Sequence, residues 1–193
     1  MDTFFTSDTH WYHKNIIRFC NRPAVDVEEM NEILIQRWNE RIKPQDHVYH
    51  LGDFAFCNKT KRLEIIRELN GIKHLIRGNH DPDSNSWWTD AGFVWVRDYY
   101  VLRYHDQYEN EEGELQQYHQ PIVLCHFPIL SWENMHHGSW HLHGHCHGSL
   151  PATRMMRMDV GVDTNNLYPY SYEEIKKIMV MRQVVPVDHH GVT

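Results

Sequence analysis

Five short polar clusters in this chain of 193 residues carry the side chains that could do chemistry. They are DTH at 8–10, GD at 52–53, GNHD at 78–81, CH at 125–126 and GHCH at 144–147. Each follows a short run of residues that is typical of a β-strand. Because ligands bind at the carboxyl ends of the strands in open α/β sheets, we expect these clusters to meet at such an edge.

The clusters offer aspartate, asparagine and histidine, which together are ligands for divalent metal ions. Carboxylate oxygens combined with imidazoles suit Mn, Fe or Zn, and no thiolate is needed. The last cluster lies within HHGSWHLHGHCHG (136–148), which holds six histidines in thirteen positions. Its composition fits a loose metal-binding tract, ordinary histidines or part of an enzyme's site. Residues elsewhere in the chain that could bind a metal ion together with these histidines distinguish the three interpretations.

The order and spelling of the five clusters resemble the calcineurin-like metallophosphoesterase family, whose pattern is D-x-H, G-D, G-N-H-[DE], a single H and G-H-x-H. All five blocks occur in order between residues 8 and 147, and SDTHWYHKNIIRFCNRP looks most like the short phage and bacterial members. The resemblance implies a single α/β domain over residues 1–193. Its fold is then a four-layer arrangement, a two-sheet β-sandwich flanked by helices, with a dinuclear metal site at the strand carboxyl ends.

The resemblance also implies which residues hold two divalent metal ions. The first ion is held by Asp8, His10, Asp53 and His147, and the second by Asp53, Asn79, His126 and His145. Asp53 bridges the ions, since the two oxygens of a carboxylate can ligate cations about 3.5–4 Å apart. The ions lower the pKa of a bridging water, which gives a hydroxide nucleophile. His80 then acts as the general acid for the leaving oxygen.

One departure from the family concerns what orients His80. In the protein-phosphatase branch, an aspartate a few positions after the bridging aspartate orients the catalytic histidine. Here that segment reads GDFAFC and contains no such aspartate, so Asp81 is the remaining candidate. The departure argues against a protein phosphatase.

Further residues are candidates for contact with a substrate. His13 is expected to line the pocket, with an exposed helix cap as the alternative, and Arg22 and Arg77 could each bind a phosphate through the guanidinium fork. The alternative for each arginine is a structural ion pair. His141 and His143 are expected to be packed, hydrogen-bonded core residues, whereas His136 and His137 stay open as pocket residues. Asp159 and Asp163 are interpreted as turn-forming or supporting carboxylates.

The elements that must position these residues alternate along the first half of the chain. Strands are predicted at 3–7, 47–51 and 72–76, and helices from Asp26 to the region of Pro44 and at 60–70. This alternation is typical of a layered α/β sheet. The second half predicts further strands, an acidic hairpin tip at 106–117 and a helix at 172–181. Loops at 11–22, 82–92 and 127–140 are expected to line the substrate pocket.

Composition restricts the possible partners. The net charge is −7 with both signs mixed, which argues against nucleic acid or an anionic membrane as a partner. The start of the chain lacks the features of a signal peptide, and no apolar run approaches the length of a membrane span. The four widely spaced cysteines fit free thiols in a cytoplasmic protein.

Together these features predict a binuclear metal-dependent phosphoric-ester hydrolase. We expect a phosphodiesterase that acts on a small or nucleotide-like phosphoester. A phosphomonoesterase, a non-catalytic interaction module on the same fold and a nuclease are the alternatives. The oligomeric state is left open, a homodimer being one alternative.

Overall fold

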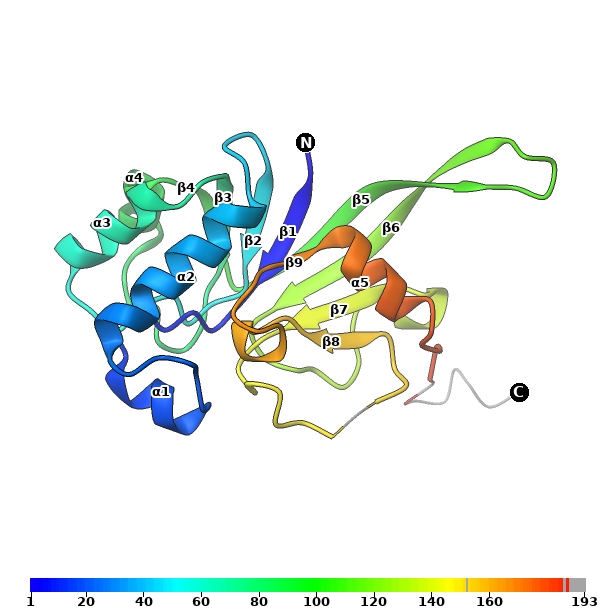
Figure 1. The fold of residues 1–193 in the computed structure, drawn as a ribbon. Helices are drawn as coiled ribbons and strands as arrows, with labels where there is room; N and C mark the ends of the chain where they lie inside the picture. Colours follow the sequence, from blue (N-terminus) through cyan, green and yellow to red (C-terminus); the bar gives the residue numbers. More distant parts are fainter. Residues whose placement is uncertain (152, 186, 188–193) are drawn as a thin grey trace.

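Two mixed β-sheets form the centre of the structure, a computed structural model that describes residues 1–151, 153–185 and 187 (Figure 1). The first sheet has the order β4-β3-β2-β1-β9 and the second the order β5-β6-β7-β8. The first sheet consists of β1 (Thr3–Thr6), β2 (His47–His50), β3 (Ile72–Ile76), β4 (Phe93–Arg97) and β9 (Tyr170–Ser171). The second consists of β5 (Tyr99–Glu109), β6 (Leu115–Cys125), β7 (Trp140–His143) and β8 (Arg157–Asp159).

The two sheets pack face to face as a sandwich. Side chains such as Phe5 and Ile76 of the first sheet share one buried cluster with Ile122 and Leu142 of the second. Alternate residues of the second sheet, such as Val123, point to the opposite face, where the segment 127–139 covers them. The predicted two-sheet sandwich is confirmed, although this outer cover holds a short 3-10 turn (Met135–His137) and no long helix.

Helices α2 (Val27–Arg41), α3 (Lys59–Glu68) and α4 (Asn85–Ala91) cover the outer face of the first sheet (Figure 1). The side chain of Asp26 caps α2 by accepting a hydrogen bond from the backbone N–H of Glu29, as the sequence predicts. Helix α5 (Tyr172–Met179) begins with a complete capping box of Ser171 and Glu174 and packs into the interior between the sheets. Short α1 (Lys14–Phe19) follows the first polar cluster.

The prediction of a loop at 82–92 is wrong for residues 85–91, which form α4. Ser84 caps this helix through the backbone N–H of Trp87, and the fully buried side chain of Trp88 anchors it to the sheet. Polar residues occupy four of the seven positions of NSWWTDA, so the apolar periodicity of the segment is too weak to predict a helix.

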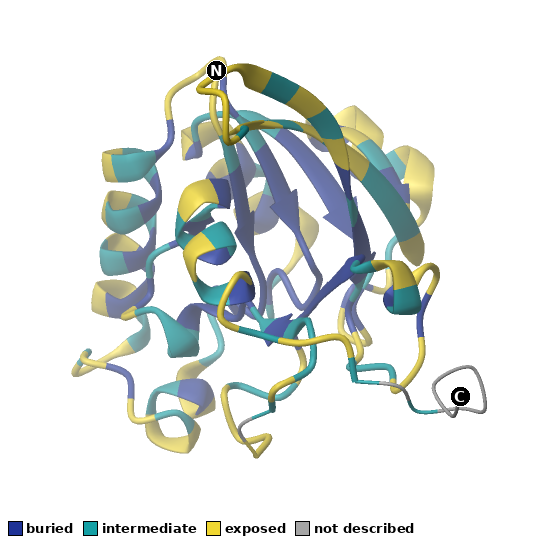
Figure 2. Ribbon diagram, turned by 90° about the vertical axis from the view of Figure 1, so that its right-hand side faces the viewer, coloured by how far each residue is buried: buried dark blue, intermediate teal, exposed yellow. Residues whose placement is uncertain are grey.

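The strands β1, β2 and β3 position the polar clusters. They are parallel neighbours, and almost every residue in them is buried, as expected for a parallel strand covered on both faces (Figure 2). Their carboxyl ends therefore lie side by side, and the turn after β1 bonds directly to the turn after β2. The backbone N–H of Asp8 donates to the carbonyl of Gly52 at 3.0 Å, and that of His10 to the carbonyl of Asp53 at 3.1 Å.

Strands β5 and β6 form a long hairpin that projects from the body of the protein (Figure 1). The acidic stretch 106–117 contains its tip, as predicted, but Asp106 is not a solvated charge. Its carboxylate accepts hydrogen bonds from the hydroxyls of Tyr118 and Tyr172 and pairs with the ammonium of Lys176 at 2.7 Å. Asp106 thus fastens the hairpin to α5.

No helix among the described residues is long and apolar enough to span a membrane.

Replacing Asp106 with alanine should lower the free energy of unfolding by about 1–3 kcal/mol at pH 7, because three donors lose a charged acceptor. Burial alone would raise the pKa of Asp106, but Lys176 and the tyrosine hydroxyls lower it to about 2. The ionised form therefore stabilises the fold above about pH 4, and this contribution is lost as the pH falls from about 4 to about 2. Urea titrations across this range should show it. Glu109→Ala, an exposed acid of the same strand, is the control and should change neither stability nor its pH dependence.

Candidate dinuclear metal centre

The turns that carry the predicted metal ligands have strained backbone. Positive φ angles occur at Asp8 (55°), His10 (51°), Asp53 (55°), His145 (70°) and His147 (48°). These are five of the seven predicted ligands, and residues other than glycine adopt this region at a cost of about 1–3 kcal/mol each. Surrounding interactions must stabilise such turns, and this concentration of strain is typical of a functional site.

Two buried side chains hold the turns after β1, β2 and β3. The imidazole of His50 accepts from the backbone N–H of Gly52 at 3.2 Å and donates to the hydroxyl of Thr9 at 2.9 Å. The Thr9 hydroxyl in turn donates to the carbonyl of Phe54 at 2.9 Å. Burial lowers the pKa of His50 to about 3, in keeping with this neutral tautomer. The network thereby links the first two turns behind the ligands.

Asp81 is the second of these side chains. Its carboxylate accepts hydrogen bonds from the backbone N–H groups of Gly78, Asp53 and Phe54 at 2.9, 2.8 and 3.0 Å. Both oxygens are thus used on backbone amides, so Asp81, the candidate considered for orienting His80, instead fixes the backbone. Close approach here also requires glycine, because a Cβ atom on Gly78 would lie 2.3 Å from the backbone nitrogen of Asp53.

The ligands predicted for the first ion lie together. The Nε2 atoms of His10 and His147 each lie 3.9 Å from Oδ1 of Asp8. His10 Nε2 also lies 3.6 Å from Oδ2 of Asp53. The donor atoms of Asp8, His10 and His147 lie within 4.8 Å of one another, a spacing at which they could hold one metal ion.

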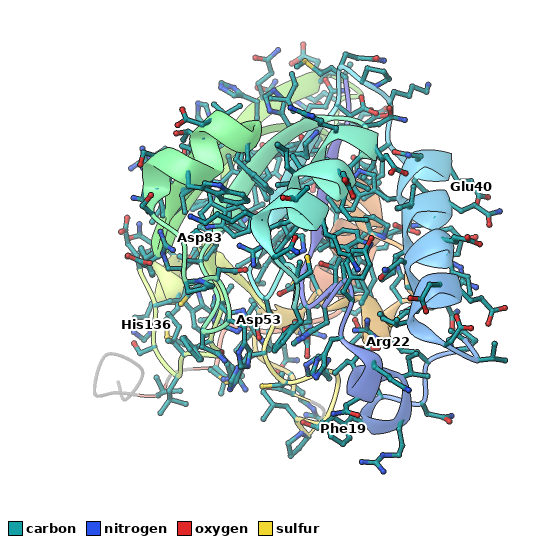
Figure 3. All side chains as sticks on the ribbon, turned by 90° about the vertical axis from the view of Figure 1, so that its left-hand side faces the viewer. Phe19, Arg22, Glu40, Asp53, Asp83 and His136 are labelled. Carbon is teal, nitrogen blue, oxygen red and sulfur yellow. The ribbon has the colours of Figure 1, made fainter. Side chains whose placement is uncertain are left out.

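The ligands predicted for the second ion form an adjoining group. Nε2 of His126 lies 3.7 Å from Oδ1 of Asp53 and 3.1 Å from Oδ1 of Asn79. Nδ1 of His145 is also 3.1 Å from the Asn79 oxygen. The two oxygens of Asp53 therefore face different groups, Oδ2 toward His10 and Oδ1 toward His126, as a bridging carboxylate requires. Figure 3 labels Asp53, which lies near the middle of that view.

Burial and charge at the centre fit divalent cations. Asp8 is fully buried, and in the absence of a cation this burial raises its pKa to about 8. Nε2 of His10 is buried and has no hydrogen-bond partner among the described residues, and burial lowers the His10 pKa to about 2, which leaves a neutral imidazole. A neutral imidazole is the form that ligates metals, and a nearby cation would stabilise the Asp8 carboxylate. The residues present thus fit a two-metal centre.

The structure places Arg22 behind the site, not on its surface. Its side chain is unexposed, and all five N–H donors have protein partners. Two donors hold the Asp163 carboxylate at 2.7 and 2.9 Å, and others hold the carbonyls of Asp8 and Thr9 at 2.7 Å. Arg22 is therefore an internal clamp with no donor left for a substrate phosphate, which corrects the substrate-binding prediction.

Asp163, which Arg22 holds, orients His147, a predicted ligand of the first ion. Its Oδ2 lies 2.7 Å from Nδ1 of His147, whose Nε2 faces Asp8. Burial alone would lower the pKa of His147, but the hydrogen bond to Asp163 raises it to about 10. A carboxylate on the far nitrogen fixes the tautomer of a metal-binding histidine and raises its basicity as a ligand. Asp163 thus makes the contacts expected of a supporting carboxylate, and its role toward a metal ion stays a prediction.

The guanidinium group of Arg77 is also occupied by protein acceptors. One of its Nη atoms donates to the carbonyls of Asp81 and Asp83, the other to the side chain of Asn85, and its Nε lies 3.4 Å from the carboxylate of Asp98. Arg77 therefore fastens the segment after GNHD, and the structure does not support its predicted contact with substrate.

His13 lies at the rim of the centre. Its Nδ1 is 3.2 Å from Nδ1 of His10, and its side chain makes no capping hydrogen bond to α1, the alternative considered for it. His13 is half-buried, so its contact with substrate stays a prediction.

Phe56 is a residue that the sequence did not single out. Its ring lies 4.1 Å from the ring of His13, 5.0 Å from that of His10 and 4.6 Å from that of the exposed His80, measured between centroids. Aromatic packing, and no carboxylate among the described residues, thus supports the His80 ring. An apolar residue three positions after Asp53 carried no recognisable signal without the fold.

The remaining histidines of the segment 136–148 form two groups, one buried and one on the 3-10 turn. His141 is buried and hydrogen-bonded to the backbone of Val123 and Ile129, and His143 is buried with Nδ1 2.9 Å from the carbonyl of Gly144. Their structural role is confirmed. His136 and His137 lie on the 3-10 turn, and their pocket role stays a prediction.

Comparison with known proteins agrees with this geometry. Residues 1–158 match the model of the calcineurin-like phosphoesterase superfamily domain, and the chain belongs to this superfamily. It is 33% identical to the uncharacterized protein MJ1445 of Methanocaldococcus jannaschii, over 94% of this chain and 93% of that one. It is 28% identical to the Gene 66 protein of Mycobacterium phage L5, over 84% and 86%. The crystal structure of a protein of unknown function from Aquifex aeolicus, AQ665, superposes with a TM-score of 0.63 at 26% identity, covering 92% of this chain and 98% of that one.

Replacing Asp163 with alanine should weaken one of two metal-binding events about 10–100-fold and leave the other within a few-fold, because only His147 loses its orienting carboxylate. Calorimetric titration with Mn²⁺ would measure both affinities. The control is Asp98→Ala, a change at a side chain that is 87% exposed. Two unchanged affinities in Asp163→Ala would contradict the assigned role.

Proposed function

We propose that the protein is a metal-dependent phosphodiesterase that acts on a small, nucleotide-like phosphoester. Membership of the calcineurin-like phosphoesterase superfamily supports a metal-dependent phosphoester hydrolase in general. The observation that carries the proposal is the position of Asp53, whose two oxygens face two separate groups of predicted ligands. That arrangement suits in-line displacement at phosphorus between two cations.

In this proposal, seven residues bind the two cations and His80 donates a proton. When bound, two divalent cations such as Mn, Fe or Zn would supply Lewis acidity and lower the pKa of water. Asp8, His10, Asp53 and His147 would hold one cation, and Asp53, Asn79, His126 and His145 the other. His80, whose backbone N–H donates to Asp53 at 2.9 Å, stands beside the centre with an exposed ring supported by Phe56. It would donate a proton to the leaving oxygen.

The charge of the surrounding side chains favours a diester over a monoester. A phosphomonoester dianion is usually bound by free guanidinium groups, and both arginines predicted for that purpose are occupied by protein acceptors. A diester carries a single negative charge, which the cations alone can compensate. A phosphomonoesterase is therefore the second candidate.

An exposed aromatic ring beside the centre supports a nucleotide-like group on the substrate. Phe127 is 44% exposed, and its ring rests edge-on against His126 and His145 at centroid distances of 4.9 and 4.8 Å. These contacts fix the ring while leaving part of it open to solvent. Stacking of a base on such a ring contributes about 1–3 kcal/mol. The net charge of −7 makes a long nucleic acid a poor substrate.

Asp53→Ala should abolish hydrolysis of bis-p-nitrophenyl phosphate by the Mn²⁺-loaded protein, because both cations lose a shared ligand.

His80→Ala should lower kcat about 10²–10⁴-fold for esters with poorly acidic alcohol leaving groups, and much less for p-nitrophenyl esters, whose leaving group needs no proton. His105→Ala, on the exposed hairpin, is the control. An equal loss with both leaving groups would contradict the acid role. Two metals per chain but no hydrolysis of any ester would favour a non-catalytic interaction module.

Phe127→Ala should raise the KM for 2′,3′-cyclic nucleotides about 5–150-fold and leave kcat nearly unchanged, since stacking acts equally in the ground and transition states. Methyl p-nitrophenyl phosphate, which lacks a base, and the variant Leu130→Ala, at a 66% exposed neighbour, are the controls. If the KM for the cyclic nucleotides does not change, the stacking role of Phe127 is excluded.

A further inference from the structure

Two exposed phenylalanines lie beside the metal centre, and they belong to different ligand groups. Phe127 contacts His126 and His145, which are predicted to hold the second ion. Phe19, the last residue of α1, is 63% exposed and belongs to a series of rings next to His10, a predicted ligand of the first ion. A phosphodiester carries two organic groups. The proposed function uses Phe127 for one of them and leaves Phe19 without a role.

Four rings form a continuous aromatic strip from His80 to Phe19. His80 packs against Phe56 at 4.6 Å, and Phe56 stacks on His13 at 4.1 Å, both measured between centroids. His13 then meets Phe19 at 6.4 Å, with an angle of 80° between the ring planes. The two end rings are exposed, and the two between them are half-buried. The surface beside the proposed acid is therefore aromatic as far as the end of α1.

The far end of the aromatic strip is cationic. The guanidinium carbon of the exposed Arg18 lies 5.3 Å from the centroid of the Phe19 ring. Arg18 forms no ion pair with a carboxylate of the residues that the structure describes. Aromatic rings and guanidinium planes are the surfaces on which proteins stack the bases of nucleotides. This end of the strip thus suits a base better than an alkyl group.

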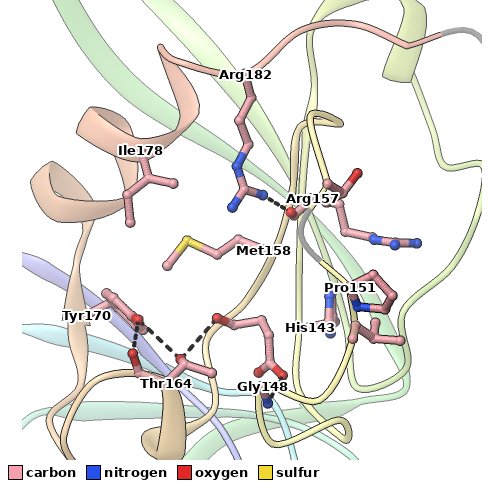
Figure 4. Close-up of a pocket in the computed structure, with 12 residues that line it drawn as sticks. His143, Gly148, Pro151, Arg157, Met158, Thr164, Tyr170, Ile178 and Arg182 are labelled. Atoms are coloured by element: carbon pink, nitrogen blue, oxygen red, sulfur yellow. Dashed lines mark hydrogen bonds between the residues drawn. The ribbon is translucent and has the colours of Figure 1, made fainter.

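The cavity between α5 and β8 is no alternative position for the group that leaves the phosphorus. This cavity of about 280 Å³ has Met158 and Ile178 in its wall (Figure 4). Neither His80 nor any predicted metal ligand is among the residues that line it. A leaving group whose oxygen takes a proton from His80 must lie beside His80 itself, which is where the aromatic strip begins.

We propose that the alcohol released in the reaction is a nucleoside whose base lies on Phe19 beside Arg18, so that the substrate is a dinucleoside phosphodiester. This inference rests on the proposed function, in which Phe127 binds the other base. Water adds to phosphorus, the bond from phosphorus to the leaving oxygen breaks, and His80 supplies the proton that this oxygen takes up. The products are a nucleoside and a nucleoside monophosphate. One base beside each ligand group holds the phosphate between the two groups that Asp53 joins.

Substrates with similarly poor leaving groups test this assignment in the Mn²⁺-loaded protein. One is 2′-deoxyadenylyl-2′-deoxyadenosine, and the others are the methyl esters of deoxyadenosine 3′- and 5′-monophosphate. The dinucleoside should have a kcat/KM about 5–150-fold higher than either methyl ester, because only the dinucleoside places a second base on the strip. Phe19→Ala should remove this preference, and Phe19→Tyr should keep it. Tyr108→Ala, at a 54% exposed aromatic residue of the distant hairpin, is the matched control and should also keep it.

Near-ultraviolet circular dichroism reports whether each variant is folded. Hydrolysis of bis-p-nitrophenyl phosphate, which has no base, tests the proposed function separately. If that ester is hydrolysed, the inference is overturned when the dinucleoside is no better a substrate than the methyl esters. It is equally overturned when folded Phe19→Ala keeps the full preference. If no ester is hydrolysed, bis-p-nitrophenyl phosphate included, the proposed function fails and the assignment of the leaving group fails with it.

Discussion

Two buried carboxylates at the ends of adjacent parallel strands, Asp8 and Asp53, determine how the rest of the site is built. Strands β1 and β2 are covered on both faces, so the residues that leave them enter the interior, where Asp8 is 0% and Asp53 3% exposed. An uncompensated carboxylate in such surroundings is costly and takes up a proton instead, as the raised pKa of Asp8 shows. A divalent cation beside Asp8 would favour its ionised form.

Holding these carboxylates in place requires support for the left-handed turns that present them. Two buried charged residues provide it in complementary ways. Arg22 has only donors, and it binds the turn after β1 by its carbonyl oxygens. Asp81 as a carboxylate has only acceptors, and it binds the turns after β2 and β3 by their amide N–H groups. The charges of these two residues are therefore used to fix the backbone, which leaves neither of them for a substrate.

Sequence patterns predicted the parts of the fold that depend on local chemistry. Polar clusters at strand ends, the cap at Asp26 and the capping box at Ser171 each act within a few residues, and each is found in the structure. For Arg22 the sequence left a structural ion pair and a phosphate contact as alternatives, because its partner Asp163 lies 141 residues away and an arginine in a loop looks the same in both roles. Phe56 was missed for the same reason, since its three histidine neighbours come from separate segments.

The support of His80 by Phe56 bears on what the centre can hydrolyse. A carboxylate beside an imidazole stabilises its protonated form and fixes one nitrogen, whereas an aromatic ring restrains the position of the imidazole without adding charge. The rim of the centre therefore gains neither a further anion near His80 nor a free guanidinium from Arg22 or Arg77. The proposed substrate, with one negative charge and a planar group, would suit such a rim better than a dianionic monoester. In the proposed function, the side chains that stabilise the strained turns would therefore also restrict the class of ester.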